Sequence, residues 1–570
     1  MKTTDTIFDA IVIGSGISGG WAAKELCEKG LKTLVLERGR EVKHPVDYPT
    51  ATKDIWEFKY RGEMGRDYKE ANPIMCKTAG LDASNAHFFI EDKDQPYVQE
   101  KPFDWFRGYQ VGGKSLTWGR ACHRWSQHEF DAPKKLGYGM DWPIDYKTVA
   151  PWYSHVEKFV GVCGNKDGLE AMPDGEFLPP FEFSCVEKAM QERIREHYPD
   201  RHMVHARWAH LTQPTELHLQ QGRGKCQARN LCMRGCPYGG YFSSVSSTLP
   251  WADKTGNMTL RPFSVVHSIM YDENSGQASG VKVIDAETKE VIEFKAKIIF
   301  LNASALNTNM ILLNSKSERF PNGLGNDNGL LGKYIGFHLY RGSASAKMPG
   351  FLDGYVFGRN PTDPIIANYR NLGKKEMDYV GGFTTYCGAY RARKSSLPKG
   401  EVQLGAPFKK ALTEAGDWHI YMYMQGETIP KATNRVYLSK TEKDPWGIPQ
   451  LVTDVSYDDN DEKMIADFLS ESKAMLEKIG GTNVEVRDNK NWNPGRDIHE
   501  MGGVRMGNNP ETSLLNEWNQ LHLCPNVFVT DGACMTSTGY QSPSILYMAL
   551  TARAANFAAE EFKNGKFDEK

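Results

Sequence analysis

The opening of the chain alternates short apolar runs with a glycine-rich turn and a helical stretch. Residues 10–13 form an apolar run with the length of a buried strand, and residues 34–36 form a second one. The glycine-rich turn and an alanine-containing stretch with helical spacing lie between them. This order predicts a βαβ unit, from which parallel α/β sheets are built.

The turn of this unit reads Gly14-Ser15-Gly16-Ile17-Ser18-Gly19, and the second strand ends at Glu37. Gly14 permits the tight turn, Gly16 leaves room for a pyrophosphate, and Gly19 lets the helix pack on the strand. The helix N-terminus would offer N–H groups to the phosphates, and Glu37 would accept hydrogen bonds from a ribose diol. We predict a dinucleotide site rather than a glycine turn without a ligand. The motif does not separate FAD from NAD, but its place early in a long chain favours FAD.

Later apolar runs predict further strands of the same domain. Residues 298–301 and 527–530 are short apolar runs, and residues 260–283 alternate in strand fashion. The run at 527–530 leads into Asp531 and Gly532, a position that suits a contact to the ribityl or phosphate linker of the cofactor. An alanine-rich stretch from Met548 to Phe562 predicts a helix whose N-terminus could face a flavin ring.

The pattern changes between residues 335 and 480. Residues 419–424 alternate in the manner of a strand, and Glu462 to Ile479 has the spacing of an amphipathic helix. We predict a two-domain protein of mixed α+β and α/β class, with a Rossmann-like FAD-binding domain and a substrate domain built on an antiparallel sheet. The predicted FAD-binding domain is discontinuous, with residues 1–334 and 481–570, and the substrate domain covers 335–480, with substrate-domain insertions near 40–100 and 140–220.

The composition narrows the class of protein. The chain has 570 residues, of which 40% are hydrophobic and 25% charged, as expected for a globular protein of two or three domains. The net charge of -2 gives no electrostatic reason to expect nucleic acid or an anionic membrane as a partner. The sequence has no apolar run with the length of a membrane span and no signal-peptide pattern. We expect a cytoplasmic protein, or a periplasmic one that is exported with a signal-bearing partner.

A second glycine-rich segment surrounds Gly112 and Gly113. Ser115 and Thr117 follow, so small and hydroxyl side chains would let the backbone approach a flat ligand. The alternative is an ordinary loop before a helix. Together with the opening motif, the segment favours a second contact to the cofactor.

Three of the 11 cysteines, Cys226, Cys232 and Cys236, lie in one short segment. Thiolates gathered in a loop can ligate an iron–sulfur cluster. Three of them would suit a 3Fe-4S cluster, or a four-iron cluster whose fourth ligand is not a cysteine. Two alternatives stay open. The thiols could simply pack in a tight glycine-rich turn, or they could bind zinc, which would need a fourth ligand from outside the segment.

The candidate for acid–base chemistry is His499. It lies in the stretch Asp497-Ile498-His499-Glu500-Met501-Gly502-Gly503, which is a poor pattern for a well-packed apolar face. A neutral imidazole can accept a proton near neutral pH. A single histidine is more often structural, so the residue alone does not decide between the two roles.

Taken in order, these segments resemble the glucose–methanol–choline (GMC) oxidoreductases. The opening motif, the Gly112-Gly113 loop, the strand end at Asn302-Ala303-Ser304, and the His499 and Asp531 blocks cover nearly the whole chain. The resemblance is greatest to the sugar-oxidising branch, with pyranose oxidases, glucoside 3-dehydrogenases and bacterial FAD glucose dehydrogenases. The cysteine spacing is similar to the cluster-binding loop of bacterial glucose and fructose dehydrogenases, and related loops occur in members without a cluster.

The resemblance implies FAD as the cofactor and His499 as the catalytic base. FAD is expected to be noncovalent, because Thr117 falls where pyranose oxidases carry the histidine that bonds the flavin. The family's second catalytic residue, a His or Asn, falls on Ser542, and the adjacent Gln541 could take its role. The full set of expected cofactor residues is Gly14, Gly16, Gly19, Glu37, Gly112, Gly113, Ser115, Thr117, Val266, Ala303, Asp531, Gly532, Pro543 and Ser544.

The expected reaction is oxidation of a secondary ring hydroxyl of a pyranose or glycoside, with C3 favoured, which gives a 3-keto sugar. His499 would abstract the proton and the hydride would pass to flavin N5. One alternative is an O2-using pyranose or glycoside oxidase that acts at C2 or C3, and another is a flavin-binding electron-transfer subunit with no alcohol site. The expected partners are the sugar or glycoside, a small export subunit, and cytochrome c or another electron acceptor.

Overall fold

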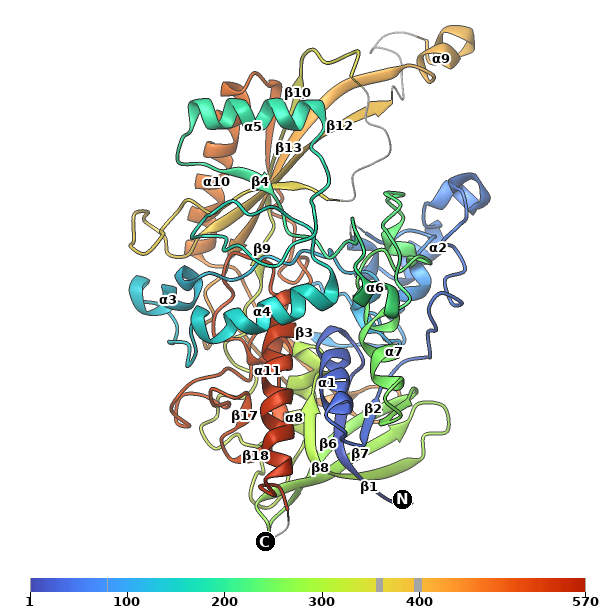
Figure 1. The fold of residues 1–570 in the computed structure, drawn as a ribbon, viewed down its shortest axis with the longest axis vertical. Coiled ribbons are helices and arrows are strands. Elements are labelled where there is room, and N and C mark those ends of the chain that lie inside the picture. The colour runs from blue at the N-terminus through green and yellow to red at the C-terminus, as the bar shows by residue number, and fades with distance from the viewer. Residues whose placement is uncertain (1, 79, 355–361, 394–401, 569–570) are drawn as a thin grey trace.

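Two large β-sheets organise the molecule and lie in separate halves of it (Figure 1). The structure is a computed structural model, and it describes residues 2–78, 80–354, 362–393 and 402–568. An eight-stranded sheet occupies the lower half of Figure 1 and a seven-stranded sheet the upper half. A three-stranded sheet is formed by β14 (Arg435–Lys443), β15 (Pro449–Asp454) and β3 (Val98–Gln99).

The eight-stranded sheet is built around β1, which spans Lys2–Ile13 and pairs in parallel with β2 on one side and β8 on the other. Its strand order is β17-β18-β8-β1-β2-β5, and β6 and β7 extend it in antiparallel fashion beside β8. Because parallel strands are covered on both faces, residues 10–13 are at most 2% exposed. The other strands are β2 (Thr33–Leu36), β5 (Met258–Arg261), β6 (Ser264–Asp272), β7 (Gln277–Asp285), β8 (Val291–Leu301), β17 (Gln520–Leu521) and β18 (Cys524–Val529).

Helices cover this sheet with small side chains at their contacts. α1 (Ile17–Glu28) follows β1 and packs against α11 (Ser544–Lys563), which also contacts α4 (Tyr146–Val160). Alanines of α1 and α11 are fully buried in one apolar cluster. α8 (Ala305–Asn314) follows β8 and packs on β6. The expected alanine-rich helix is therefore confirmed as a central element of the core.

The seven-stranded sheet is antiparallel and has two helices on one of its faces. α5 (Cys185–His197) and α10 (Asp459–Lys478) share an apolar cluster with alternate residues of β13, among them Trp418 and Ile420. The intervening residues of β13 point to the opposite face. Its strand order is β16-β10-β13-β12-β11-β4, and β9 pairs with β13. The strands are β4 (Met203–His205), β9 (His338–Leu339), β10 (Gly342–Met348), β11 (Pro364–Ile366), β12 (Phe383–Arg393), β13 (Ala415–Glu427) and β16 (Thr482–Asp488).

The two sheets bear on the predicted division of the chain. The seven-stranded sheet takes most of its strands from residues 335–480, and it also contains β4 from the 140–220 segment and β16 after residue 480. The remaining helices are short. They are η1 (Ile55–Glu57), η2 (Lys59–Gly62), α2 (Arg66–Ala71), η3 (Met75–Lys77), η4 (Ala86–Phe88), η5 (Gly113–Leu116), α3 (Gln127–Leu136), α6 (Glu216–Gln220), η6 (Cys232–Arg234), η7 (Ser244–Ser246), α7 (Thr248–Asp253), α9 (Gly405–Ala411) and η8 (Gly532–Cys534).

The predicted class is confirmed by this arrangement of a mostly parallel sheet with helices and a separate antiparallel sheet. The expected strands at 10–13, 34–36 and 298–301 are confirmed as parts of β1, β2 and β8. The amphipathic helix is confirmed as α10. A search of the described residues found no helix with both the length and the apolar character that a membrane crossing needs.

Two glycines of the first turn should respond differently to alanine. A Cβ on Gly19 would lie 1.8 Å from the carbonyl oxygen of Gly14, whereas a Cβ on Gly16 meets no described atom within 4 Å. We expect Gly19→Ala to lower the free energy of unfolding by about 3 kcal/mol or more. The matched variant Gly16→Ala should change the free energy of unfolding of the cofactor-free protein by less than about 0.5 kcal/mol, yet retain less FAD after gel filtration.

Urea unfolding and the ratio of flavin to protein absorbance check both expectations. Equal stability of the two variants would contradict the packing argument, and full FAD retention by Gly16→Ala would contradict the pyrophosphate contact.

Candidate active site

The turn between β1 and α1 leaves an open space at Gly16. A Cβ atom on Gly14 would lie 2.3 Å from the carbonyl oxygen of Asn302, so packing requires glycine at Gly14 as it does at Gly19. At Gly16 packing does not require glycine, because a Cβ there would meet no described atom within 4 Å. The free space fits a position that is kept clear for a bound pyrophosphate.

Glu37 at the end of β2 is tied back to this turn. Its Oε2 accepts hydrogen bonds from the backbone N–H of Ser15 (3.2 Å) and from the Ser15 hydroxyl (2.6 Å). Its Oε1 accepts from the backbone N–H of Gly39 at 3.0 Å. Burial raises the pKa of Glu37, and these hydrogen bonds oppose the rise. The acid expected at the ribose is therefore held beside the glycine turn.

The Gly112 loop folds over the same turn. The backbone N–H of Gly112 donates to the Ser15 hydroxyl at 3.0 Å, and a Cβ on Gly113 would lie 3.3 Å from the Cα of Gly16. Gly112 has a φ of 88°, in the region that favours glycine. The Ser115 hydroxyl donates to the carbonyl oxygen of Gly112 at 2.5 Å. The structure thus brings the two predicted cofactor segments together.

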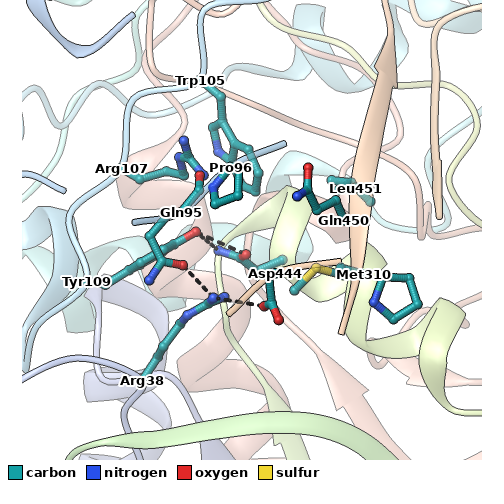
Figure 2. A pocket seen from close by; sticks show the side chains of 12 residues that line it. Arg38, Gln95, Pro96, Trp105, Arg107, Tyr109, Met310, Asp444, Gln450 and Leu451 are labelled. Atoms are coloured by element: carbon teal, nitrogen blue, oxygen red, sulfur yellow. Dashed lines mark hydrogen bonds and ion pairs between the residues drawn. The ribbon is translucent and has the colours of Figure 1, made fainter. Parts of the chain in front are cut away.

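A small cavity lies beside this region, at Arg38. Figure 2 shows Arg38 between Gln95 and Asp444, with its Nη2 2.5 Å from Gln95 Oε1 and 3.4 Å from Asp444 Oδ2. Tyr109 and Asn307 share a hydrogen bond of 3.2 Å on the same cavity wall. The cavity has a volume of about 20 Å³, which is room for about one water molecule. Arg38 connects the end of β2 to the β14–β15 turn through Asp444. The cavity itself is too small for a substrate.

The ends of β8 and β18 meet at one threonine. Asp531 Oδ2 accepts from the Thr308 hydroxyl at 2.6 Å, and Asp531 Oδ1 accepts from the backbone N–H of Ala533 at 3.0 Å. The backbone N–H of Ala303 donates to the same Thr308 hydroxyl at 3.3 Å. Burial raises the pKa of Asp531 to about 6. A Cβ on Gly532 would lie 2.5 Å from the carbonyl oxygen of Glu500, which joins this region to the His499 block.

The remaining expected cofactor residues flank these segments. Val266 pairs with Val283 in the β6–β7 ladder, and Thr117 follows the last residue of η5. Pro543 and Ser544 begin α11, whose first turn has no side-chain cap in the described part of the chain. Uncapped N–H groups of this kind are open to an anionic ligand.

These features fit FAD. The free space at Gly16 and the uncapped start of α1 suit its pyrophosphate, Glu37 suits its ribose, and the start of α11 suits its flavin end. The individual contacts to the cofactor stay predictions.

His499 lies beside a second histidine, His338 of β9. Their Nδ1 atoms are 2.8 Å apart, and His338 Nε2 lies 3.1 Å from the carbonyl oxygen of Thr538 and 3.0 Å from that of Gly539. Burial lowers the pKa of His338 to about 4. Burial, together with the neighbouring His338 and Lys114, also lowers the pKa of His499 well below its usual value. Both rings are therefore neutral at neutral pH.

The hydrogen bonds define the tautomer of each ring. Carbonyl oxygens only accept, so His338 carries its hydrogen on Nε2. Its Nδ1 must then be an acceptor, and the Nδ1 of His499 must donate to it. His499 is left with an unprotonated Nε2. The residue keeps part of its surface accessible, and an unprotonated ring nitrogen can accept a proton.

Asp497 adds a carboxyl group to the histidine pair. Its Oδ2 accepts from the backbone N–H of His338 at 2.6 Å, and its Oδ1 has no partner among the described residues. Burial raises the pKa of Asp497 to about 7, and the carboxylate of Glu500 adds to the rise. Asp497, His338 and His499 have ligand-type atoms within 4.8 Å of one another. The facing nitrogens are already joined by a hydrogen bond, which accounts for the cluster without a metal ion.

Lys114 links the cofactor loop to this block. Its Nζ lies 3.1 Å from Glu500 Oε2, and the Glu500 side chain is 3% exposed. The positive charge of Lys114 acts on both His499 and Asp531, because it lowers the pKa of each. The loop that is expected to contact the cofactor therefore also contributes to the electrostatics of the candidate base.

Ser542 belongs to a hydrogen-bond chain that reaches the neighbourhood of His499. Its hydroxyl donates to Gln425 Oε1 at 3.1 Å and lies 3.0 Å from the Tyr386 hydroxyl. Gln425 Oε1 also accepts from the Tyr340 hydroxyl at 2.7 Å. The ring of Tyr340 lies 6.4 Å from that of His499. Ser542 is thus connected towards the candidate base through other side chains.

Gln541 has a different environment. Its backbone N–H donates to Glu129 at 3.2 Å, and its side-chain Nε2 lies 3.4 Å from the carbonyl oxygen of Ala171. Its Oε1 has no hydrogen-bond partner within the described chain. None of these bonds involves His338 or His499.

The three cysteines of the 222–242 segment are free thiols. Cys226 Sγ lies 3.8 Å from His210 Nδ1, and Cys236 Sγ accepts from the backbone N–H of Gly240 at 3.4 Å. Burial raises the pKa of Cys226 to about 11, with neighbouring thiols adding to the rise. The structure brings the thiols into one region, and the iron–sulfur cluster stays a prediction.

Two residues of the site could not be recognised in the sequence alone. Lys114 stands between the predicted cofactor residues Gly113 and Ser115, so its position in the loop was its only signal. His338 follows the short apolar run at 335–337, but nothing in the sequence pairs it with a residue 161 positions away.

Comparisons with known proteins agree with this geometry. Two family models described as GMC oxidoreductase match residues 8–339 and 430–551. A 2-methyl-1,2-propanediol dehydrogenase of Mycolicibacterium austroafricanum is 28% identical over 99% of this chain and 97% of its own length. A fructose dehydrogenase large subunit of Gluconobacter japonicus is 24% identical over 98% of both chains.

The fold also matches a solved structure of formate oxidase from Aspergillus oryzae RIB40. The TM-score is 0.62 at 13% identity, over 98% of this chain and 99% of the other. The resemblance expected from the motifs is confirmed by the family models, which together match well over half of the sequence. The chain belongs to the GMC oxidoreductase family, whose members bind FAD and oxidise alcohols or sugars at CH–OH groups.

Proposed function

We propose that this enzyme oxidises a secondary ring hydroxyl of a pyranose or glycoside, with C3 as the favoured position. The observation that carries the proposal is the neutral histidine pair, in which His499 has an unprotonated Nε2. A sugar substrate is supported by the similarity to a fructose dehydrogenase large subunit. It is also supported by the phenol groups of Tyr340 and Tyr386 in the hydrogen-bond chain of Ser542.

His499 acts as the general base in this proposal. Its Nε2 accepts the hydroxyl proton, while its Nδ1–H bond to His338 fixes the orientation of the ring. The transfer leaves a positive charge on the histidine pair, and ionised Asp497 stabilises that charge because it lies within 4.8 Å. When bound, FAD supplies the acceptor for the hydride that leaves the substrate carbon.

Ser542 is assigned a positioning role. Its hydroxyl is engaged by Gln425 and Tyr386, so it helps hold the Tyr340 ring beside His499. Gln541, whose Oε1 is unpaired within the described residues, stays the second candidate for a contact to the substrate oxygen.

A second candidate substrate is a small branched diol. The similarity to 2-methyl-1,2-propanediol dehydrogenase favours it, and the histidine pair would act on an acyclic hydroxyl by the same chemistry. An O2-using oxidase would share this site and differ in the acceptor. For a dehydrogenase, we propose cytochrome c or another carrier in a partner subunit, because the fructose-oxidising relative is named as a large subunit. A dye-coupled screen of sugars, glycosides and diols, with NMR identification of the product, separates these candidates.

Removal of the base should strongly slow the reduction of the flavin by the substrate. We expect His499→Gln to slow anaerobic bleaching of the flavin by about 10²- to 10⁴-fold, because no group is left to accept the proton. The exposed His197 at the end of α5 provides the matched control. His197→Gln should bleach at the wild-type rate. A His499→Gln protein that bleached as fast as this control would remove the base assignment.

The rate of flavin reduction should also depend on the ionisation of Asp497. Its pKa is raised to about 7, so the side chain is neutral below this pH and negative above it. Because the negative form stabilises the positive histidine pair, the rate should rise as the pH increases through about 7. Asp497→Asn keeps an acceptor for the backbone of His338 but cannot ionise. Stopped-flow measurements should find this rise absent in the variant, and an identical rise in both proteins would rule out Asp497 as its source.

A further inference from the structure

One face of the seven-stranded sheet carries a row of tyrosines that begins at the candidate base. α5 and α10 pack on the opposite face, which carries Trp418 and Ile420 of β13. Tyr421 and Tyr423 of β13 alternate with those residues and keep part of their surface accessible. Tyr390 of β12 is 49% exposed. The proton transfer proposed above does not require any of these three tyrosines.

The rings form a continuous path away from His499. The ring centroid of Tyr340 lies 6.4 Å from that of His499 and 6.0 Å from that of Tyr423. Tyr423 is 6.3 Å from Tyr421, and Tyr421 is 6.1 Å from Tyr390. We call Tyr340, Tyr386, Tyr390, Tyr421 and Tyr423 the tyrosine platform.

A glycine lets the middle of the platform lie flat on the sheet. Gly388 of β12 is the cross-strand partner of Tyr421. A Cβ on Gly388 would lie 2.7 Å from the Tyr421 hydroxyl oxygen and 3.0 Å from its Cζ, so the ring covers the glycine backbone. The rings of Tyr421 and Tyr423 are within 12° of parallel, and those of Tyr423 and Tyr386 within 4°. One face of the Tyr421 ring is therefore turned to the sheet, and the residue keeps part of its surface accessible.

Hydroxyl groups flank the aromatic rings. Ser343 and Ser345 of β10 are the cross-strand partners of Tyr423 and Tyr421 on the second side of β13. Both serines keep accessible surface. The Tyr421 hydroxyl donates to Asp363 at 2.7 Å. Aromatic area bordered by hydroxyl groups suits a ring that has apolar faces and polar edges.

We propose that the tyrosine platform binds a second ring of the substrate, so that the enzyme prefers two-ring glycosides to single sugars and small diols. The second ring is another pyranose or an aromatic aglycone, and it lies on Tyr423 and Tyr421 while the reacting ring lies at His499. This inference rests on the proposed function. The aromatic contact would account for about three- to tenfold in kcat/KM, because aromatic pairs contribute about 0.5–1.5 kcal/mol beyond the burial of area.

The test compares kcat/KM for a methyl glucoside, the phenyl glucoside of the same anomer and a glucose disaccharide. For the wild-type enzyme we expect at least one two-ring substrate to exceed the methyl glucoside about tenfold. Tyr421→Ala should lower this ratio about three- to tenfold, whereas Tyr421→Phe keeps the ring and should hold the ratio within about twofold. Comparison of kcat/KM for the phenyl glucoside with that for the disaccharide shows whether the second ring is an aromatic group or a pyranose.

Two further variants distinguish the loss of the Tyr421 contact from a general effect of the substitution on folding. Gly388→Ala displaces the Tyr421 ring without removing it, and it should also lower the ratio. Tyr437→Ala removes a tyrosine of β14 that lies outside the platform and bonds to Glu100, and it should leave the ratio unchanged. A ratio near one in the wild-type enzyme, or a ratio unaffected by both Tyr421→Ala and Gly388→Ala, would overturn this inference alone. Oxidation of no glycoside at all would overturn the proposed function as well.

Discussion

A hydrogen bond between two Nδ1 atoms can form only when one imidazole carries a hydrogen there and the other does not. In this protein the backbone determines which ring carries the hydrogen on Nδ1. The carbonyl oxygens of Thr538 and Gly539 both face the Nε2 of His338, so that nitrogen carries the hydrogen of His338. The state of His499 is therefore fixed by a loop 40 positions away in the sequence, just before α11. The backbone before α11 therefore determines which ring nitrogen of His499 is free to accept a proton.

Much of the fold could be predicted because the information is local. In the first βαβ unit, strand length, turn glycines and helical spacing are all contained in about thirty consecutive residues. The packing then explains each glycine separately, since Gly14 and Gly19 are required by backbone contacts and Gly16 is not. The family could also be predicted, since its motifs occur in order, and the family models confirm it.

The parts that could not be predicted depend on contacts between distant segments. His338 and Lys114 become part of the site only when β9 and the Gly112 loop are placed against the His499 block. The alternation along β13 predicted a strand, but both of its faces carry large side chains, so the sequence did not reveal which face met the helices. β16 joins the antiparallel sheet beyond residue 480, because strand partners are chosen by tertiary packing rather than by the sequence of the strand.

The connection between two neighbouring strands has a consequence for biosynthesis. β8 ends at Leu301 and its parallel partner β18 begins at Cys524, and most of the antiparallel sheet lies between them in the chain. The ribosome therefore synthesises most strands of the seven-stranded sheet before it makes β18 and α11, which complete the eight-stranded sheet and its helical cover. Since domains form as their segments emerge, the seven-stranded sheet can assemble before β18 and α11 complete the predicted nucleotide site. The predicted flavin site is therefore complete only after α11 has been translated.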